Sequence, residues 1–254
     1  MIRAVFIYML FAAPFARAES AADKLAREGI AEFTAAYQAW DGARFAAATE
    51  LFRQASTNTS ANATNFYWLG ASEFHHMLQL RGSPTNAAAA AAALESAIEA
   101  LDAAVKLDER HAESHALLGT LYGMRINGSL LRAAWYGPRV AKDQNGALDA
   151  GASNPRVQYL LGMCQFHTAS KPAKWEETLT TLLKAEKLFE TETRIPAAPL
   201  EPRWGHDSCL TFIGLTYELL GQRPEAAAYF RKALAMHPAD HLAVEGLKRV
   251  SENK

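Results

Sequence analysis

The sequence is poor in features that mark several common classes of protein. It contains only two cysteines, Cys164 and Cys209, so it is not a scaffold held together by disulfides. Its 26 Lys and Arg residues against 27 Asp and Glu give a net charge of −1, which excludes the broadly basic surface of most nucleic-acid-binding proteins. It also has no nucleophile-elbow, phosphate-loop or dinucleotide-binding glycine motif. These absences predict a non-enzymatic protein with no cofactor and no nucleic-acid partner.

Alanine is the residue present in excess. It makes up roughly a fifth of the chain, well above ordinary usage, and half of all residues are hydrophobic. Alanine has the highest helix propensity and is depleted in strands, so the composition favours an all-α protein with a continuous core.

The N-terminus has the pattern of an export signal. Arg3 precedes the apolar run 4–13, which is too short to cross a bilayer, and Ala16-Arg17-Ala18 offers the small residues that signal peptidases recognise. We therefore predict a signal peptide over residues 1–18, cleavage before Glu19, and export to a bacterial periplasm or beyond it. An uncleaved N-terminal anchor is the alternative. No later run of eighteen apolar residues exists, so no integral membrane segment is expected in the mature chain.

The clearest internal repeat spans residues 207–240. Its key positions are Leu210, Ile213, Gly214, Tyr217, Gly221, Ala226, Phe230, Ala233 and Pro238. Gly214 and Ala226 are small where two helices would cross, and Pro238 ends the second helix because proline lacks the amide donor. This spacing resembles the tetratricopeptide repeat, a helix–turn–helix unit of about 34 residues.

The same period divides the rest of the chain, although the other units match less completely. They span residues 29–62, 63–111, 112–154 and 155–206, and a final helix over 241–251 would cap the last unit. The resemblance implies an all-α, right-handed α-solenoid of about five helix–turn–helix units with a C-terminal capping helix, forming one domain over residues 19–254. The stretch 154–207 also resembles exported bacterial repeat proteins to which no activity is assigned.

A solenoid of this kind has a concave face lined by the first helix of each pair, and this face is the predicted binding site. Aromatic and arginine side chains, which are enriched at protein interfaces, would lie there. The candidate partner-binding residues are Phe33, Tyr37, Trp40, Tyr67, Phe74, His75, Arg125, Arg156, Tyr159, Phe166, His167 and Trp204. The competing interpretation is that several of them are core residues. The Lys, Asn and Arg positions with which chaperone-binding members grip a carboxylate are not matched.

The predicted function is therefore an exported scaffold that binds a protein or peptide partner in the groove, with a membrane-protein complex as one setting. The alternative is a periplasmic small-molecule or lipid-binding component that serves a transporter. An enclosed apolar pocket, rather than an open trough, would favour that alternative.

Three insertions interrupt the repeats. The segment 81–93 ends in seven alanines and is expected to extend a helix. The segment 191–205 contains three prolines and must be a loop, which either covers the groove or is pinned to the solenoid by Trp204. The segment 132–138 is expected to link two helices, with Trp135 as its anchor.

The cysteines and histidines do not predict a chemical site. Cys164 and Cys209 fall in neighbouring first helices but roughly 10 Å out of step along the axis, too far for a disulfide, which favours two small buried thiols. Histidines recur four residues apart at 111 and 115 and at 237 and 241, but neither pair sits on one helix with a third ligand. No metal site is predicted.

Overall fold

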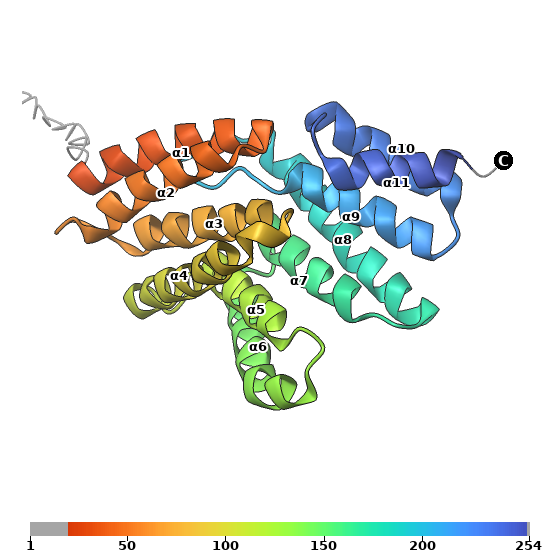
Figure 1. Ribbon diagram of the computed structural model, residues 1–254, viewed down its shortest axis with the longest axis horizontal. Coiled ribbons are helices and arrows are strands. Elements are labelled where there is room, and N and C mark those ends of the chain that lie inside the picture. Colours follow the sequence, from red (N-terminus) through yellow and green to blue (C-terminus); the bar gives the residue numbers. More distant parts are fainter. Residues whose placement is uncertain (1–19, 253–254) are drawn as a thin grey trace, which may run out of the picture.

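The computed structural model describes residues 20–252, so the predicted signal peptide at 1–18 lies outside the described residues. These residues form eleven α-helices, one short 3-10 helix and no strands (Figure 1). The helices are α1 (Ala21–Ala39), α2 (Gly42–Thr57), α3 (Ala63–Leu80), α4 (Ala87–Leu107), α5 (Ala112–Ile126), α6 (Leu130–Gly151), α7 (Pro155–Thr168), α8 (Pro172–Glu192), α9 (His206–Leu219), α10 (Arg223–Met236) and α11 (His241–Ser251), with η1 at Pro84–Asn86. None of them is both long and apolar enough to cross a bilayer.

The helices pack as five successive pairs, α1 with α2 through α9 with α10, and α11 covers the last pair. Side chains that accept hydrogen bonds from free amides begin several of these helices; Asp41, Asn62, Asn154 and Asp240 each serve as an N-cap. Helices α3, α5 and α7 begin at the first residues of the predicted units, whereas α1 begins eight residues before the predicted start at 29. The all-α solenoid predicted from the repeats is confirmed.

A glycine lies at the close crossing within every pair. A Cβ atom added at Gly70 or Gly162 would come within 2.5 Å of a leucine side chain on the second helix. The full set of these glycines is Gly29, Gly70, Gly119, Gly162 and Gly214, one on each first helix. The small glycine predicted at the helix crossing of the 207–240 unit therefore recurs in every pair, because a larger residue there would press against the second helix.

Two of the three insertions are helical. The alanine run begins α4, as expected. The prediction for 132–138 is wrong, because this segment lies inside α6, which continues through Pro138. Proline removes one intrahelical hydrogen bond but does not stop the turns on either side. Trp135 is not an anchor, since its side chain is 67% exposed.

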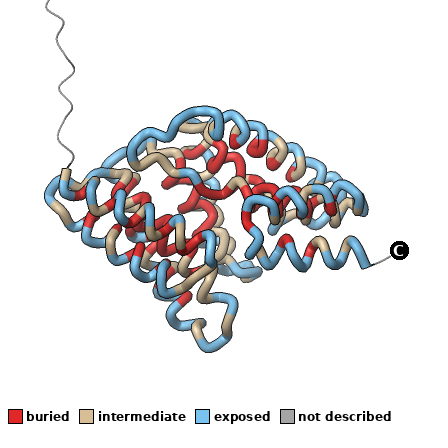
Figure 2. Tube along the Cα trace, turned by 90° about the horizontal axis from the view of Figure 1, so that it is seen from above, coloured by how far each residue is buried: buried red, intermediate tan, exposed pale blue. Residues whose placement is uncertain are grey.

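The two ends of the solenoid meet. The Tyr37 hydroxyl at the end of α1 donates to Asp207 Oδ1 on α9 at 3.0 Å, and its ring stacks on His237 at 5.4 Å. Trp40 lies 6.4 Å from the His241 ring at the start of α11. The repeats therefore curl into a closed body, with buried residues gathered in its middle (Figure 2).

Candidate functional site

The segment 193–205 between α8 and α9, which we call the inner strap, lies across the inner side of α3. The Trp204 indole Nε1 donates to the Tyr67 hydroxyl at 3.0 Å, and its ring packs edge-on against His75 at 4.7 Å. The Trp68 indole in turn donates to the Leu200 carbonyl at 2.8 Å. The two predicted roles of the loop therefore coincide, because Trp204 pins it to α3 and the pinned loop covers part of the inner face.

Half of the predicted partner-binding residues belong to the interior. These are Phe33, Tyr67, Phe74, His75, Arg156 and Trp204, each at most 5% exposed. The prediction that they line an open groove is wrong. The inner strap and the meeting of the solenoid ends cover this part of the inner face, so these side chains pack against one another instead.

Arg156 shows how a residue predicted to bind a partner is used within the fold. Its Nε donates to Glu113 at 2.7 Å and its Nη1 to Glu192 at 2.9 Å, while its guanidinium lies over the Phe189 ring. Burial alone would lower the pKa of Arg156, but Glu113 and then Glu192 outweigh it and raise that pKa. The guanidinium therefore ties α7 to α5 and α8.

His75 occupies a cage of aromatic rings. The rings of Phe33, Phe74 and Trp204 lie edge-on at 4.7 to 5.1 Å, and Nδ1 lies 2.8 Å from the Ala71 carbonyl. Burial in this apolar cage lowers the pKa of His75 to about 4, because the charged imidazolium loses its hydration. The side chain is therefore a neutral core residue near neutral pH.

The part of the concave side that stays open is a group of three adjoining cavities, which we call the central cleft. Their volumes are about 600, 320 and 730 Å³, and all three are lined by Arg81 and Met124. The first lies between α3, α4, α5 and α6, the second reaches α1, α9 and α11, and the third runs along α5 to α7.

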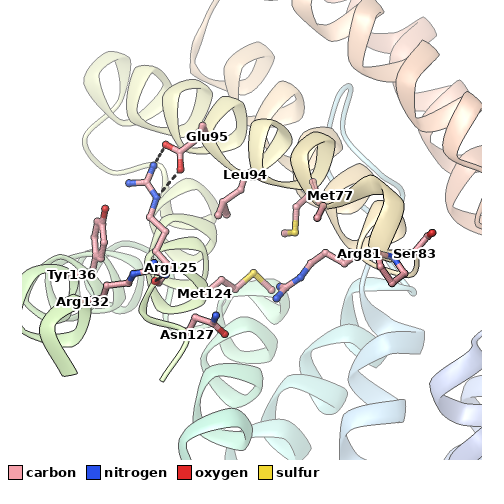
Figure 3. A pocket seen from close by; sticks show the side chains of 14 residues that line it. Met77, Arg81, Ser83, Leu94, Glu95, Met124, Arg125, Asn127, Arg132 and Tyr136 are labelled. Carbon is pink, nitrogen blue, oxygen red and sulfur yellow. Dashed lines mark hydrogen bonds and ion pairs between the residues drawn. The ribbon is translucent and has the colours of Figure 1, made fainter. Parts of the chain in front are cut away.

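Arg81 is the cation at the centre of this cleft. It follows the last residue of α3 and extends toward Met124 on α5 (Figure 3). Within residues 20–252 its guanidinium has no hydrogen-bond or ion-pair partner. The pKa of His167 is lowered, first by the burial of that histidine and second by the positive charge of Arg81. The nearby Glu95 is occupied by Arg125, and Asp240 caps α11. Arg81 is therefore free to receive an anionic group.

The rest of the predicted partner-binding residues lie in or beside the cleft. Tyr37, Trp40, Tyr159 and His167 line the 320 Å³ cavity, although Tyr37 and Tyr159 are themselves buried, and Arg125 lines the 600 Å³ cavity. Phe166 is half-buried and packs edge-on against Phe212 at 5.3 Å. Arg81 was missed because it falls in an insertion that has no counterpart in the repeat pattern.

The cleft walls are mainly apolar and adaptable. Met77, Met124 and Met163 contribute side chains from three successive first helices, and Trp40 and Phe212 contribute aromatic surface. Methionine fits irregular contacts because it is unbranched and polarisable, and it recurs on surfaces that bind varied partners.

The remaining candidate residues carry no metal or redox site that the structure describes. Both cysteines are free; Cys209 is buried, as expected, whereas Cys164 is only partly buried, and burial raises the pKa of each thiol. His115 Nδ1 bonds Asp143 at 2.8 Å, so this histidine links α5 to α6. Within residues 20–252 no three His, Cys, Asp or Glu side chains lie close enough to share a metal ion.

Comparison with solved structures identifies the fold. A tetratricopeptide-repeat protein of Thermus thermophilus, TTC0263, has a TM-score of 0.62 at 17% identity, covering 90% of this chain and 98% of its own. The HusA haemophore of Porphyromonas gingivalis has a TM-score of 0.58 at 17% identity, covering 79% and 94%. No protein-family model and no curated protein matches the sequence. The fold is that of tetratricopeptide-repeat proteins.

Proposed function

We propose that this chain, which has the fold of tetratricopeptide-repeat proteins, is a non-enzymatic scaffold that binds an extended segment of a partner protein in the central cleft. The observation that carries the proposal is that three cavities border Arg81 and Met124 and together reach from α1 and α11 to α6. Fold alone does not select a partner, so the chemistry of these walls decides its type.

The cleft favours a segment with apolar side chains and an acidic group. Methionine and aromatic walls offer burial to apolar side chains, which is the main driving force of association. Arg81 lacks a carboxylate partner within residues 20–252 and would pair with an aspartate, glutamate or C-terminal carboxylate of the partner. Because the cleft is built on helices, little ordering of the scaffold would oppose binding.

A peptide library displayed on phage tests this proposal. Peptides enriched on the wild-type protein should be rich in apolar and acidic residues, and should lose binding to Met124→Trp, in which the cleft is filled. Leu219→Trp is the matched control, because Leu219 is 44% exposed at the C-terminal end of α9 and lines none of the three cavities. Failure to enrich any peptide, or equal binding to Met124→Trp and the wild type, would contradict the proposal.

Binding of a flat apolar small molecule is a second candidate. The 320 Å³ cavity has aromatic and methionine walls, includes His167 and His241, and has Arg81 at its edge. HusA, which shares the fold, is a haemophore. The ring of a porphyrin could pack against such walls, with its iron bound by His167 or His241 and its carboxylates near Arg81.

Titration with haemin separates the two candidates. Porphyrin binding would shift and sharpen the haemin absorbance at one molar equivalent, and His167→Ala with His241→Ala would weaken it. Gln222→Ala, an exposed residue remote from the cavity, is the control. A spectrum identical to that of free haemin would eliminate this candidate and leave the peptide proposal untouched.

We also propose that the chain is exported, on the basis of the N-terminal pattern at residues 1–18. Expression in a Gram-negative host followed by mass spectrometry of the periplasmic fraction tests it. A chain beginning at Glu19 is the expected product, and an intact N-terminus in the cytosolic fraction alone would contradict it.

A further inference from the structure

The outer face of α6 is apolar and has no partner among residues 20–252. It consists of Leu130, Leu131, Ala134, Trp135 and Pro138, which the helical period brings to one side, and all five are exposed. Leu130 is 88% exposed, Leu131 86% and Trp135 67%. No other described part of the chain places three large apolar side chains this exposed within six residues.

The rest of α6 explains why this face stays uncovered. The opposite side of the helix packs on α5, where Tyr136 stacks on Tyr122 at 5.9 Å. Only Asp143 and Ala147 are buried in α6, and both belong to its C-terminal half. The N-terminal half extends with the end of α5 away from the body, at the bottom of Figure 1. Core packing therefore does not account for the two leucines and the tryptophan.

The charged side chains on α6 from Leu130 to Lys142 have one sign. From Ser114 to Lys142 the sequence has no Asp or Glu, whereas Arg132, Arg139 and Lys142 flank the apolar positions. Arg139 lies over the Tyr122 and Tyr136 rings, and Arg132 donates to the Arg125 carbonyl. None of these three cations has an ion pair within residues 20–252. A local positive patch thus stands on a chain whose net charge is −1.

We propose that the outer face of α6 docks on an anionic lipid surface. A helix with Leu and Trp on one side and cations beside them is the arrangement that lies in a membrane interface, with the apolar face among the acyl chains. Arginine and lysine reach the phosphates from the flanks while their stems stay apolar, and tryptophan favours the interface because its ring is amphipathic. This proposal does not depend on what the central cleft binds.

A second copy of the chain is a poorer occupant of the same face. A symmetric contact would bring Arg132 and Lys142 of both copies together, and like charges repel at a desolvated interface. An anionic membrane instead supplies the opposite charge over its whole surface.

Docking in this way would also orient the cleft. Arg132, at the edge of this face, and Tyr136, on the other side of the helix, line the 600 Å³ cavity. The mouth of that cavity would therefore lie close to the lipid surface.

Vesicle flotation tests the proposal, with vesicles of phosphatidylcholine alone and of phosphatidylcholine with one-third phosphatidylglycerol. The full chain and a chain beginning at Glu19 are both used, because the second removes the apolar run 4–13 from the measurement. The test variant is Leu130→Ser with Leu131→Ser and Trp135→Ser. The matched control is Leu107→Ser with Leu219→Ser and Met236→Ser, which removes exposed apolar side chains elsewhere.

The chain beginning at Glu19 should float with the anionic vesicles. Partitioning should fall by about a hundredfold in the test variant and stay unchanged in the control. Arg132→Gln with Lys142→Gln should lower it by about tenfold and remove most of its salt dependence. Circular dichroism melting should be unchanged, since all the altered side chains are exposed.

Three outcomes would overturn the proposal. They are no flotation of the chain beginning at Glu19, equal flotation of the test variant, or equal flotation with neutral and anionic vesicles. A lipid-free dimer in sedimentation that the test variant dissociates would assign the face to a second copy instead.

Discussion

Acid should destabilise this fold through His75. Burial among aromatic rings lowers the pKa of His75 from 6.5 to about 4, so the folded protein resists a proton that the unfolded chain accepts. The stability that neutral His75 contributes is fully present above pH 6.5. It is lost as the pH falls toward 4, because at these pH values the unfolded state binds more protons than the folded state.

The size of this effect follows from the shift in pKa. A lowering from 6.5 to about 4 corresponds to about 3 kcal/mol of unfolding free energy once the pH is below both values. Between pH 7.5 and pH 5 the loss from this one group is about 2 kcal/mol. Phenylalanine fills the same space among the rings and does not titrate, so His75→Phe should lose about 2 kcal/mol less over that interval.

Urea unfolding followed by far-ultraviolet circular dichroism at pH 7.5, 6 and 5 measures the difference. The quantity to compare is the slope of the unfolding free energy against pH. His75→Phe also changes packing, but this change shifts the unfolding free energy by the same amount at every pH and leaves the slope unaffected. Leu107→Ala, which removes an exposed side chain that does not titrate, should keep the wild-type slope. Equal losses in the wild type and in His75→Phe would refute the assignment of a neutral, caged imidazole.

Four further substitutions test the packing. Arg156→Met should cost about 3–5 kcal/mol in chemical denaturation, since it leaves two largely buried carboxylates without their cation, and a smaller loss would mean that water reaches them. Gly214→Ala should lower the free energy of unfolding by about 1–3 kcal/mol, because its Cβ would lie 2.7 Å from the Phe230 ring. Gly123→Ala should instead raise it by about 0.5–1 kcal/mol, because no atom lies within 4 Å of the added Cβ. Tyr37→Phe should cost about 1–3 kcal/mol and speed amide exchange at the ends of α1 and α9, because it removes the hydroxyl that joins them; unchanged exchange would contradict that link.

The sequence predicts local structure here better than it predicts the site. Small residues at helix crossings and the period of about 34 residues depend on contacts within one helix pair, so the starts of α3, α5 and α7 could be placed. Pro138 was misleading, because a proline that usually ends a helix lies inside α6.

The site depends on contacts that no local pattern encodes. Tyr37 and Asp207 are 170 positions apart, and Trp204 reaches Tyr67 across 137 positions. Because of such contacts, half of the residues predicted to line the concave face are buried in the core. These contacts also left Arg81, an unremarkable residue of an insertion, at the centre of the open cleft.

The meeting of α1 with α9 and α11 changes how this array should unfold. In an open array each repeat is held only by its neighbours, so the end repeats fray first and cooperativity fades with length. Here the first and last repeats hold each other, and neither can detach without breaking the bonds of Tyr37. Fraying from either terminus should therefore be suppressed, and the chain should unfold in a single transition. Folding should be slower than in an open array of equal length, because this long loop must close before its contacts form.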